Sequence, residues 1–458
     1  MIALSLKEVA EACGGTLDGA DPDAVIRAVV TDSRLASPGS VFFALPGENL
    51  DGHVFVTDAV RAGAAVAVVR DDAAIDPPAI RVSDTVGALG LLAELVRSRL
   101  RATTIAITGS SGKTGTKDFT SAACSSERRT VAANASYNNE IGVPLTIFSA
   151  DEDTEILVVE VGARGIGHIS SLAPMIRPDV AVITNIGPAH IGMFGSLDNT
   201  ARAKGELFEA LPAEGTAIVN ADDRYAEQLA SRTTARVVRF GRSPDADVRA
   251  EDVVLDADAR ASFTLVSEQQ RAGVTLRVPG EHMVPNALAA AAAARACGVS
   301  LRGAADGIAR AEGSAWRMEV RDVGGRRILN DAYNANPDSM TAALKALAAM
   351  SRGRPSWAVL GHMAELGDEA TAAHDRIGRL AVRLGVTHLV TVGEDARAIH
   401  EAARLEGMFG GEAIYAASAD DAIASVRARM EPDAVVLVKA SRAAGLERIA
   451  RALEVPDA

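Results

Sequence analysis

The stretch ATTIAITGSSGKTGTKDF, residues 102–119, combines a strand pattern, a turn rich in glycine and serine, and the start of a helical pattern. The apolar residues up to Ile107 are typical of a buried strand. Gly109 and Gly112 allow a turn in which backbone N–H groups point inward around phosphate oxygens. The usual phosphate-binding pattern is Gly-x-x-x-x-Gly-Lys-Ser/Thr, and here Ile107 occupies the place of the first glycine. The stretch therefore predicts a nucleotide site built from a strand, a loop and a helix.

The polar residues of this loop suit the binding of a nucleotide. Lys113 supplies a mobile cation for the outer phosphates, and the hydroxyl of Thr114 is a ligand for Mg²⁺. The N-terminus of the following helix adds a partial positive charge. An ordinary Gly/Ser turn with a chance lysine is the alternative, but both the context and the Gly-Lys-Thr spacing favour a phosphate site. The predicted nucleotide contacts are Thr108, Gly109, Ser110, Ser111, Gly112, Lys113, Thr114 and Gly115.

Strand and helix patterns alternate on both sides of the loop. The apolar runs EILVVEVG, DVAVITNIG and TAIVNADD are each closed by Gly, Asn or Asp, as expected for buried parallel strands. A further alternation begins near residue 313 and predicts another parallel sheet. Residues 241–280 alternate apolar and polar side chains, which predicts a small antiparallel extension. We therefore expect an α/β fold of three domains: a smaller N-terminal α/β domain (1–100), a central P-loop parallel-sheet ATPase domain (101–312) and a C-terminal Rossmann-like domain (313–458).

The composition restricts the possible partners. Of the 458 residues 48% are hydrophobic but only 3% aromatic, so aliphatic side chains must fill the cores. The net charge of −13 argues against a nucleic-acid binder, which usually has a basic face. The three cysteines lack the spacing of a metal site. No signal-peptide pattern begins the chain, and its longest apolar run, residues 287–294, is shorter than the ~20 residues that span a bilayer. We expect a cytoplasmic monomer that does not insert into membranes.

The loop and several later segments together resemble the Mur ligase and folylpolyglutamate synthase superfamily, and the similarity extends along nearly the whole chain. Members of this superfamily are three-domain, ATP-dependent amide-bond ligases. The resemblance thus implies the same architecture and ATP as a substrate. The segments that carry it, besides the shortened loop, are ASYNNEIGVPLT (135–146), VVEVGARGIGHI (158–169), TNIGPAHIGMFGS (184–196), ARAKGELF (201–208) and NDAYNANPDSM (330–340).

The resemblance implies two Mg²⁺ ions and a set of catalytic residues. Glu160 ends a strand beside the loop, at the edge where open α/β sheets bind ligands, and is expected to be a metal ligand rather than a helix cap. His190 follows the next strand and would contact a second ion, although this hard cation prefers oxygen ligands. Lys204 would be carbamylated, so that its added carboxylate holds the second Mg²⁺. Lys113, His190 and Lys204 are then the expected catalytic residues.

Other site residues are assigned by the same resemblance. Asn286 would contact adenine from the start of a helix, although Met283 stands where the family usually has Asn. Arg317 would reach the ATP phosphates from a domain boundary, and Trp316 replaces the usual glycine before it. Capping of local turns is the alternative for TDSR (31–34) and for the asparagines after residue 330. The remaining expected contacts are Asp331 for ATP, and Asp32, Ser33, Arg34, Asn138, Asn139, Tyr333, Asn334, Asn336, Lys439, Ser441 and Arg442 for the other substrates.

Within the superfamily, NIGPAH…FGS and NDAYNANPDSM are most similar to members that join D-alanyl-D-alanine to UDP-N-acetylmuramoyl-tripeptide during peptidoglycan precursor synthesis. The alternatives are a sister Mur ligase that adds one amino acid, and a ligase like folylpolyglutamate synthase. The diaminopimelate-adding type usually carries Asp-Asn-Pro-Arg, which is absent here, and the folate enzymes lack a domain like residues 1–100. A non-catalytic nucleotide switch would need only the phosphate loop and one metal, so Glu160, His190 and Lys204 together argue against it.

Overall fold

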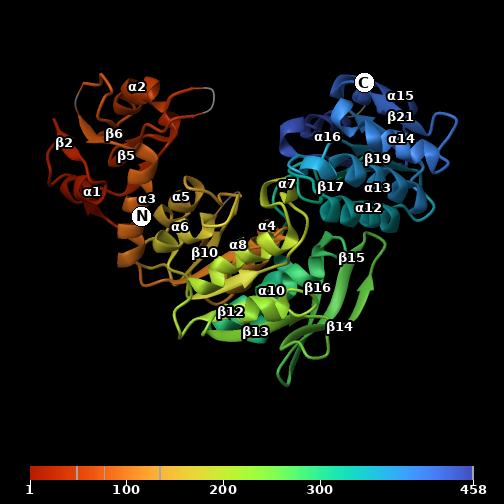
Figure 1. Cartoon of the computed structure of the whole chain (residues 1–458), viewed down its shortest axis with the longest axis horizontal. Helices are drawn as coiled ribbons and strands as arrows, with labels where there is room; N and C mark the ends of the chain where they lie inside the picture. The colour runs from red at the N-terminus through yellow and green to blue at the C-terminus, as the bar shows by residue number, and fades with distance from the viewer. Residues whose placement is uncertain (48–49, 77, 134–135, 456–458) are drawn as a thin grey trace.

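The computed structural model describes residues 1–47, 50–76, 78–133 and 136–455. It confirms the expected three-domain α/β architecture, with the central domain joined to the N-terminal domain on one side and to the C-terminal domain on the other (Figure 1). None of the helices formed by the described residues has the length and apolar character needed to cross a membrane.

The N-terminal domain has a five-stranded sheet of order β2-β7-β6-β5-β4, parallel except for β2. A two-stranded antiparallel pair, β1 and β3, lies beside it. Helix α3 closes the domain and packs against α5 and α6 of the central domain, so that one hydrophobic core continues from one domain into the next. The elements are β1 (Leu4–Ser5), α1 (Leu6–Ala12), β2 (Thr16–Asp18), β3 (Val25–Ile26), β4 (Ala28–Val30), η1 (Ser33–Leu35), β5 (Ser40–Phe43), η2 (Gly52–Phe55), α2 (Val56–Arg61), β6 (Val66–Arg70), β7 (Ala79–Val82) and α3 (Thr85–Arg99).

The central domain is built on a nine-stranded sheet of order β16-β15-β14-β13-β12-β11-β8-β10-β9. Its strands from β9 to β14 in this order are parallel, and β14, β15 and β16 pair antiparallel, which confirms the predicted antiparallel extension. The strands are β8 (Thr103–Thr108), β9 (Thr130–Ala132), β10 (Ile156–Glu160), β11 (Val180–Ile183), β12 (Thr216–Asn220), β13 (Arg236–Gly241), β14 (Val248–Leu255), β15 (Arg260–Ser267) and β16 (Gln270–Pro279).

The helices of the central domain cover its sheet. The alanine-rich α10 is almost wholly buried against α4, α11 and the strands, because small side chains allow close approach. The helices are α4 (Lys113–Ser125), α5 (Gly142–Phe148), α6 (His168–Ile176), α7 (Ile191–Phe194), α8 (Leu197–Glu209), α9 (Ala226–Ala230), α10 (Met283–Ala296) and α11 (Leu301–Arg310).

The C-terminal domain has a six-stranded sheet of order β17-β18-β22-β19-β20-β21. All pairs are parallel except the edge pair β17 and β18, which form a hairpin. The elements are β17 (Glu319–Val323), β18 (Arg326–Asn330), α12 (Pro337–Ser351), β19 (Ser356–Leu360), η3 (Gly367–Glu369), α13 (Ala370–Arg383), β20 (His388–Val392), η4 (Glu394–Ala396), α14 (Arg397–Leu405), β21 (Ala413–Ala416), α15 (Ala419–Arg429), β22 (Val435–Lys439), η5 (Arg442–Ala444) and α16 (Glu447–Leu453).

The carboxyl ends of parallel strands share one edge of a sheet, and in this molecule two such edges meet. Strands β8, β10 and β11 of the central sheet and strands β18 and β22 of the C-terminal sheet end beside one cavity. Open α/β sheets bind ligands at this edge. The fold therefore brings together segments separated by more than two hundred residues of chain.

Candidate active site

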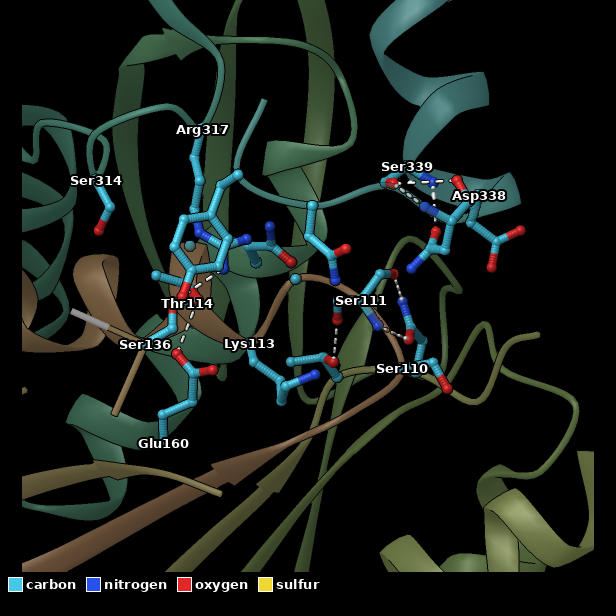
Figure 2. Close-up of a pocket in the computed structure, with 18 of the residues that line it drawn as sticks. Ser110, Ser111, Lys113, Thr114, Ser136, Glu160, Ser314, Arg317, Asp338 and Ser339 are labelled. Atoms are coloured by element: carbon cyan, nitrogen blue, oxygen red, sulfur yellow. Dashed lines mark hydrogen bonds between the residues drawn. The ribbon is translucent and has the colours of Figure 1, made fainter. Parts of the chain in front are cut away.

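A cavity of about 510 Å³ lies between the central and C-terminal domains (Figure 2). Its volume lies within the range of small-molecule sites. Most of the residues predicted from the sequence line this one cavity, from both sides of the domain boundary. They are Ser110, Ser111, Gly112, Lys113, Thr114, Gly115, Asn138, Asn139, Glu160, His190, Lys204, Asn286, Arg317, Asp331, Tyr333, Asn334, Asn336 and Lys439.

Two glycines of the phosphate loop are required by the geometry of the backbone. Gly109 has φ +151°, and a Cβ atom there would collide with Oγ1 of Thr184. Gly112 has φ +79°, and a Cβ atom there would collide with Oδ1 of Asn286. Helix α4 begins at the next residue, as predicted, and the first turn of a helix leaves N–H groups free to bind an anion.

Lys113 is the first residue of α4, and its Nζ donates a hydrogen bond of 2.9 Å to the carbonyl oxygen of Gly109. Burial lowers the pKa of Lys113 from its ordinary value, while nearby Glu160 opposes the shift. The ammonium group of Lys113 therefore lies within the predicted phosphate-binding loop.

Glu160 ends β10 with both carboxylate oxygens engaged. Oγ1 of Thr114 donates to its Oε2 at 2.8 Å, and Nδ2 of Asn138 donates to its Oε1 at 2.7 Å. A hydroxyl and a carboxylate are thus held side by side, and these are the hard oxygen donors that Mg²⁺ prefers. The described residues contain no cluster of three or more His, Cys, Asp or Glu side chains suited to a metal. Such a cluster is not needed by Mg²⁺, which takes one or two carboxylates together with phosphates and waters.

Lys204 lies in α8 and is buried, with 1% of its surface exposed. Its Nζ is 5.8 Å from the centroid of the Phe194 ring and makes no hydrogen bond or ion pair within the described residues. Burial, reinforced by the charge of Lys113, lowers the pKa of Lys204 well below its ordinary value. A lysine in this setting favours the neutral amine.

His190 stands at the start of α7 with φ +59°, a conformation that is uncommon for a residue with a side chain. Its Nδ1 contacts a carboxylate oxygen of Glu365, which belongs to the C-terminal domain. Burial lowers the pKa of His190, against the opposing effect of Glu365. The imidazole therefore faces the cavity and also bridges the domain boundary.

Asn286 lies in α10 beside the phosphate loop. Its Nδ2 is 3.5 Å from Sδ of Met283, a weak acceptor. The thioether thus stands where the asparagine expected at position 283 would have offered an amide. Helix α10 begins at Met283, and among the described residues no side-chain hydrogen bond caps its start.

The linker between α11 and β17 is fixed to both domains. The N–H and the Oγ of Ser314 donate to Oδ2 of Asp118 in α4, at 3.2 Å and 2.6 Å. At the other end, the N–H of Met318 donates to Oδ1 of Asp331 at 3.0 Å. The linker therefore connects the helix of the phosphate loop directly to the end of β18.

Arg317, within this linker, points into the cavity (Figure 2). Its Nη2 donates to Oγ of Ser136 at 2.9 Å, and its guanidinium lies 4.1 Å from the centroid of the Tyr333 ring. The preceding Trp316 has φ +59°, the left-handed region that favours glycine, the residue expected there from the resemblance. Its ring is covered by the guanidinium of Arg442, at 4.4 Å.

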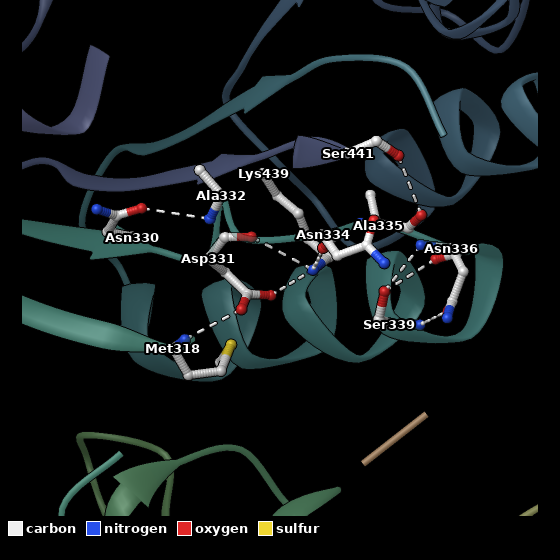
Figure 3. A network of polar contacts seen from close by, with 10 residues as sticks. All are labelled: Met318, Asn330, Asp331, Ala332, Asn334, Ala335, Asn336, Ser339, Lys439 and Ser441. Atoms are coloured by element: carbon white, nitrogen blue, oxygen red, sulfur yellow. Dashed lines mark hydrogen bonds and ion pairs between the residues drawn. The ribbon is translucent and has the colours of Figure 1, made fainter. Parts of the chain in front are cut away.

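The loop after β18 forms the C-terminal wall of the cavity (Figure 3). Lys439 is buried, and its Nζ donates to Oδ2 of Asp331 at 2.6 Å and to the carbonyl oxygen of Asn334 at 2.8 Å. Burial lowers the pKa of Lys439, while the charge of Asp331 opposes that shift. Within the described residues these contacts hold the loop in place.

The two predicted asparagines of this loop differ. Asn336 caps α12: its Oδ1 accepts from the N–H of Ser339 at 2.8 Å, and Pro337 occupies the first helical turn. The capping alternative is therefore what the structure shows for Asn336. Asn334 accepts at Oδ1 from the N–H of Ala335 at 2.9 Å, and its side chain is exposed to the cavity.

Some predicted residues lie outside the lining of the cavity. In the N-terminal domain Asp32 caps η1 and pairs with Arg34, whose side chain is 87% exposed. Ser441 is buried, where its Oγ accepts from the N–H of Ala364 at 2.8 Å. Those not brought to the cavity are Thr108, Gly109, Asp32, Ser33, Arg34, Ser441 and Arg442; the first two underlie the phosphate loop.

Several residues that line the cavity were missed from the sequence, among them Asp118, His282 and Asp338. Asp118 lies in the stretch that contains the phosphate loop, and Asp338 lies in the segment NDAYNANPDSM, in which other residues were predicted to bind substrate. The available signal was a charged side chain near the carboxyl edge of a predicted strand. Their position depends on contacts between segments far apart in the sequence, which no local pattern contains.

Comparison with known proteins gives matches along most of the chain. The model described as Mur ligase family, catalytic domain, matches residues 25–98. The Mur ligase middle domain matches residues 107–294, and the Mur ligase, glutamate ligase domain, matches residues 316–442.

Individual relatives are similar over their full length. The chain is 44% identical to the UDP-N-acetylmuramoyl-tripeptide–D-alanyl-D-alanine ligase of Mycobacterium tuberculosis, with 100% of this chain and 99% of the relative covered. MurF from Acinetobacter baumannii superposes with a TM-score of 0.87 at 32% identity, covering 99% of each chain. MurF ligase from Thermotoga maritima, in complex with ADP, superposes with a TM-score of 0.80 at 26% identity, covering 93% of this chain and 97% of the other.

Proposed function

The chain belongs to the Mur ligase family, and from this we propose that it joins D-alanyl-D-alanine to a UDP-N-acetylmuramoyl-tripeptide in an ATP-dependent reaction. The product is a precursor of peptidoglycan, so the enzyme acts in the synthesis of the cell wall. The observation that carries this assignment is the full-length similarity to a UDP-N-acetylmuramoyl-tripeptide–D-alanyl-D-alanine ligase. It is supported by a cavity that the phosphate loop lines on one side and the loop after β18 on the other.

The cavity suits a reaction in two transfers. In the first, the terminal carboxylate of the tripeptide attacks the γ-phosphate of ATP, which gives an acyl phosphate and ADP. In the second, the amine of the dipeptide attacks the activated carbonyl and displaces phosphate. The loop from Ser110 to Thr114 would bind the phosphates, and Arg317 would reach them from the linker. Positioning and charge neutralisation are the main contributions that the protein makes to such a reaction.

The residues of the cavity fit one Mg²⁺ ion as they stand. Thr114 and Glu160 would hold it, because a hydroxyl and a carboxylate lie 2.8 Å apart at the end of the phosphate loop. A bound Mg²⁺ ion would neutralise charge on the transferring phosphoryl group. A second ion would need a further oxygen ligand, because Glu365 is engaged with the imidazole of His190 and an unmodified Lys204 offers no oxygen.

We propose that Lys204 supplies that group as a carbamate. The buried side chain has no hydrogen-bond or ion-pair partner within the described residues, and its lowered pKa favours the neutral amine that reacts with CO₂. The product carries a carboxylate, which a neighbouring metal ion would stabilise. His190 would complete this second site after releasing Glu365.

The uridine end of the donor would bind the N-terminal domain, where Asp32, Ser33 and Arg34 form an exposed turn. We place the domain limits near residues 100 and 312, because these positions fall between α3 and β8 and between α11 and β17. The enzyme would act as a monomer in the cytoplasm, where ATP and UDP-linked donors are present.

The proposed function is tested by phosphate release from ATP with each substrate added alone and together. Sustained release is expected only when both the UDP-tripeptide and D-alanyl-D-alanine are present. A panel of amines serves as the specificity control. Sustained turnover with a single charged amino acid in place of the dipeptide would contradict the assignment.

A further inference from the structure

Asp338 lies in the first turn of α12 and faces the phosphate loop across the domain boundary (Figure 2). A Cβ atom added at Gly187, in the loop after β11, would lie 2.5 Å from Oδ2 of Asp338 and 3.6 Å from Cβ of Ser110. Gly187 has no unusual φ, so this contact shows how closely the carboxylate approaches the loop after β11 rather than a strain of the backbone. The carboxylate of Asp338 therefore lies against the loop after β11, near Ser110 of the phosphate loop.

Asp338 differs from the other carboxylates that line the cavity. Asp118 accepts from Ser314 and pairs with Lys117, while Glu160 accepts from Thr114 and Asn138. The remaining two are ion-paired, Asp331 with Lys439 and Glu312 with Arg277. Within the part of the chain that the structure describes, Asp338 makes no side-chain hydrogen bond or ion pair. It is open to the cavity and therefore available to a ligand.

A carboxylate without a partner beside a phosphate site repels the negative charge of ATP, unless a cation lies between them. Lys113 and Arg317 belong to the phosphate side, and Lys439 is committed to Asp331 and Asn334. The incoming dipeptide itself brings a cation, because an α-amino group has a pKa of about 8 and is largely protonated at neutral pH. An ammonium ion cannot attack a carbonyl until it has lost a proton.

We propose that Asp338 binds the ammonium group of the acceptor dipeptide and takes a proton from it. This role rests on the proposed function, since it needs an acyl phosphate and an amine in the same cavity. Asp338 is placed for it: it enters from the C-terminal domain, whose loop after β18 lies next to it, and it faces the phosphate loop. The protein around the carboxylate raises its pKa above the ordinary value because water is displaced, which makes it a better proton acceptor.

Atoms and charge are conserved in this proton transfer and the bond formation that follows it. The carboxylate of Asp338 accepts one proton from R–NH₃⁺ and becomes a neutral acid, leaving R–NH₂. The nitrogen lone pair forms the C–N bond with the acyl phosphate carbon, and the C–O bond to phosphate then breaks. The second proton leaves the nitrogen with the departing phosphate, and Asp338 returns its proton to solvent.

A purely structural role for Asp338 is the competing explanation, because an acidic residue in the first turn stabilises a helix. The chain contains a matched control for it. Asp420 occupies the same second position of α15, after a capping box formed by Ser418 and Asp421, and its side chain is 78% exposed, away from the cavity. Asp420→Asn removes the same helix-terminal charge without touching the cavity.

The test compares the wild type, Asp338→Asn, Asp338→Glu and Asp420→Asn with two acceptors. One is D-alanyl-D-alanine, and the other is hydroxylamine, which is uncharged at neutral pH and forms a hydroxamate from an acyl phosphate without a base. Asp338→Asn should lose about 10²- to 10⁴-fold in kcat with the dipeptide, the usual contribution of a general base. Its hydroxamate formation should change only a few-fold, and Asp338→Glu should recover part of the dipeptide activity. Asp420→Asn should behave as wild type.

The outcomes separate the two proposals. Equal loss with both acceptors in Asp338→Asn, or no loss with the dipeptide, would overturn the role of Asp338 and leave the ligase assignment intact. A wild-type enzyme that forms neither the peptide product nor the hydroxamate would overturn the proposed function itself.

Discussion

Oγ1 of Thr114 and Oε2 of Glu160 are joined by a hydrogen bond of 2.8 Å, which connects the first turn of α4 to the last residue of β10. This pair defines the proposed Mg²⁺ position. Glu160→Gln keeps the size of the side chain and removes its charge. We expect a loss of about 10²-fold or more in kcat/KM and a higher Mg²⁺ requirement, because a metal ion stabilises phosphoryl transfer by several kcal/mol.

Initial rates measured against Mg²⁺ concentration check this expectation. Glu155→Gln is the control, since Glu155 lies just before the same strand and pairs with Arg128 at the surface. Wild-type rates and an unchanged Mg²⁺ midpoint in Glu160→Gln would rule out the metal role.

Lys113→Ala should abolish product formation with little change in melting temperature. Within the described residues its ammonium group donates a hydrogen bond to the loop carbonyl of Gly109 alone, so the fold should depend little on it. Lys117, one turn further along α4, gives the opposite case because its buried Nζ donates to the carbonyl oxygen of Ala133 at 2.7 Å. Lys117→Ala should lower the free energy of unfolding by about 1–3 kcal/mol. An active Lys113→Ala enzyme with normal melting would contradict the phosphate-loop assignment.

Lys204→Ala should lose most of the ligase activity, and a short carboxylate such as formate should restore part of it. The physical reason is that a carbamate would attract the second metal ion, whereas a free ammonium would repel it. Wild-type activity should also fall when CO₂ and bicarbonate are removed from the buffer and should return when they are added. Full activity of Lys204→Ala without any additive would show that no carbamate is needed.

Asn334→Ala and Asn336→Ala should have different effects, although the two residues stand in one loop. Asn334→Ala should raise KM for D-alanyl-D-alanine much more than for ATP, with about 1–3 kcal/mol lost if a buried partner is left unpaired. Asn336→Ala removes the cap of α12 and should lower the free energy of unfolding by about 0.5–2 kcal/mol. Steady-state kinetics and urea unfolding distinguish them. Equal increases in both KM values for Asn334→Ala would point to a structural role.

His282 should make the stability of the unliganded protein depend on pH. Burial lowers the pKa of His282 from 6.5 to about 4, with Asp331 opposing and Lys439 adding to the shift. The folded protein thus binds this proton less tightly than the unfolded chain does. The contribution of His282 is complete above pH 6.5 and is lost as the pH falls toward 4, by up to about 3 kcal/mol. Urea unfolding between pH 7 and pH 4 should show a shallower decline for His282→Gln, and an equal decline would refute the prediction.

The sequence was sufficient for the elements whose signals are local. The strand before Thr108, the loop and α4 follow from one continuous pattern, and Glu160 follows from the rule that ligands bind at the carboxyl edge of a sheet. The antiparallel extension was also visible as an alternation of side chains. Strand β17 was missed because its side chains are mostly polar, although Gly324 and Gly325 between β17 and β18 are a hairpin signal.

The relationships across the domain boundary had no such signal. Asp118 and Ser314 are separated by 196 residues, and His190 and Glu365 by 175, so only the folded chain brings them together. The same holds for Asp338 and Gly187. The apolar run before Lys439 was enough to predict that this residue ends a strand at the edge of a sheet. Its hydrogen bond to Asp331 could not be predicted, because it depends on the pairing of β22 with the neighbouring strand β18.

The linker that carries Trp316 is attached to both halves of the cavity. Ser314 is bonded to α4, while the carbonyl oxygen of Trp316 accepts from the N–H of Tyr333 in the C-terminal domain. Ala315 is the residue between these two attachments, so its backbone torsions contribute to the position of the C-terminal domain relative to the phosphate loop. Because Asp338 and the phosphate loop belong to different domains, a substitution that restricts Ala315 would act on a cavity to whose lining Ala315 itself does not belong.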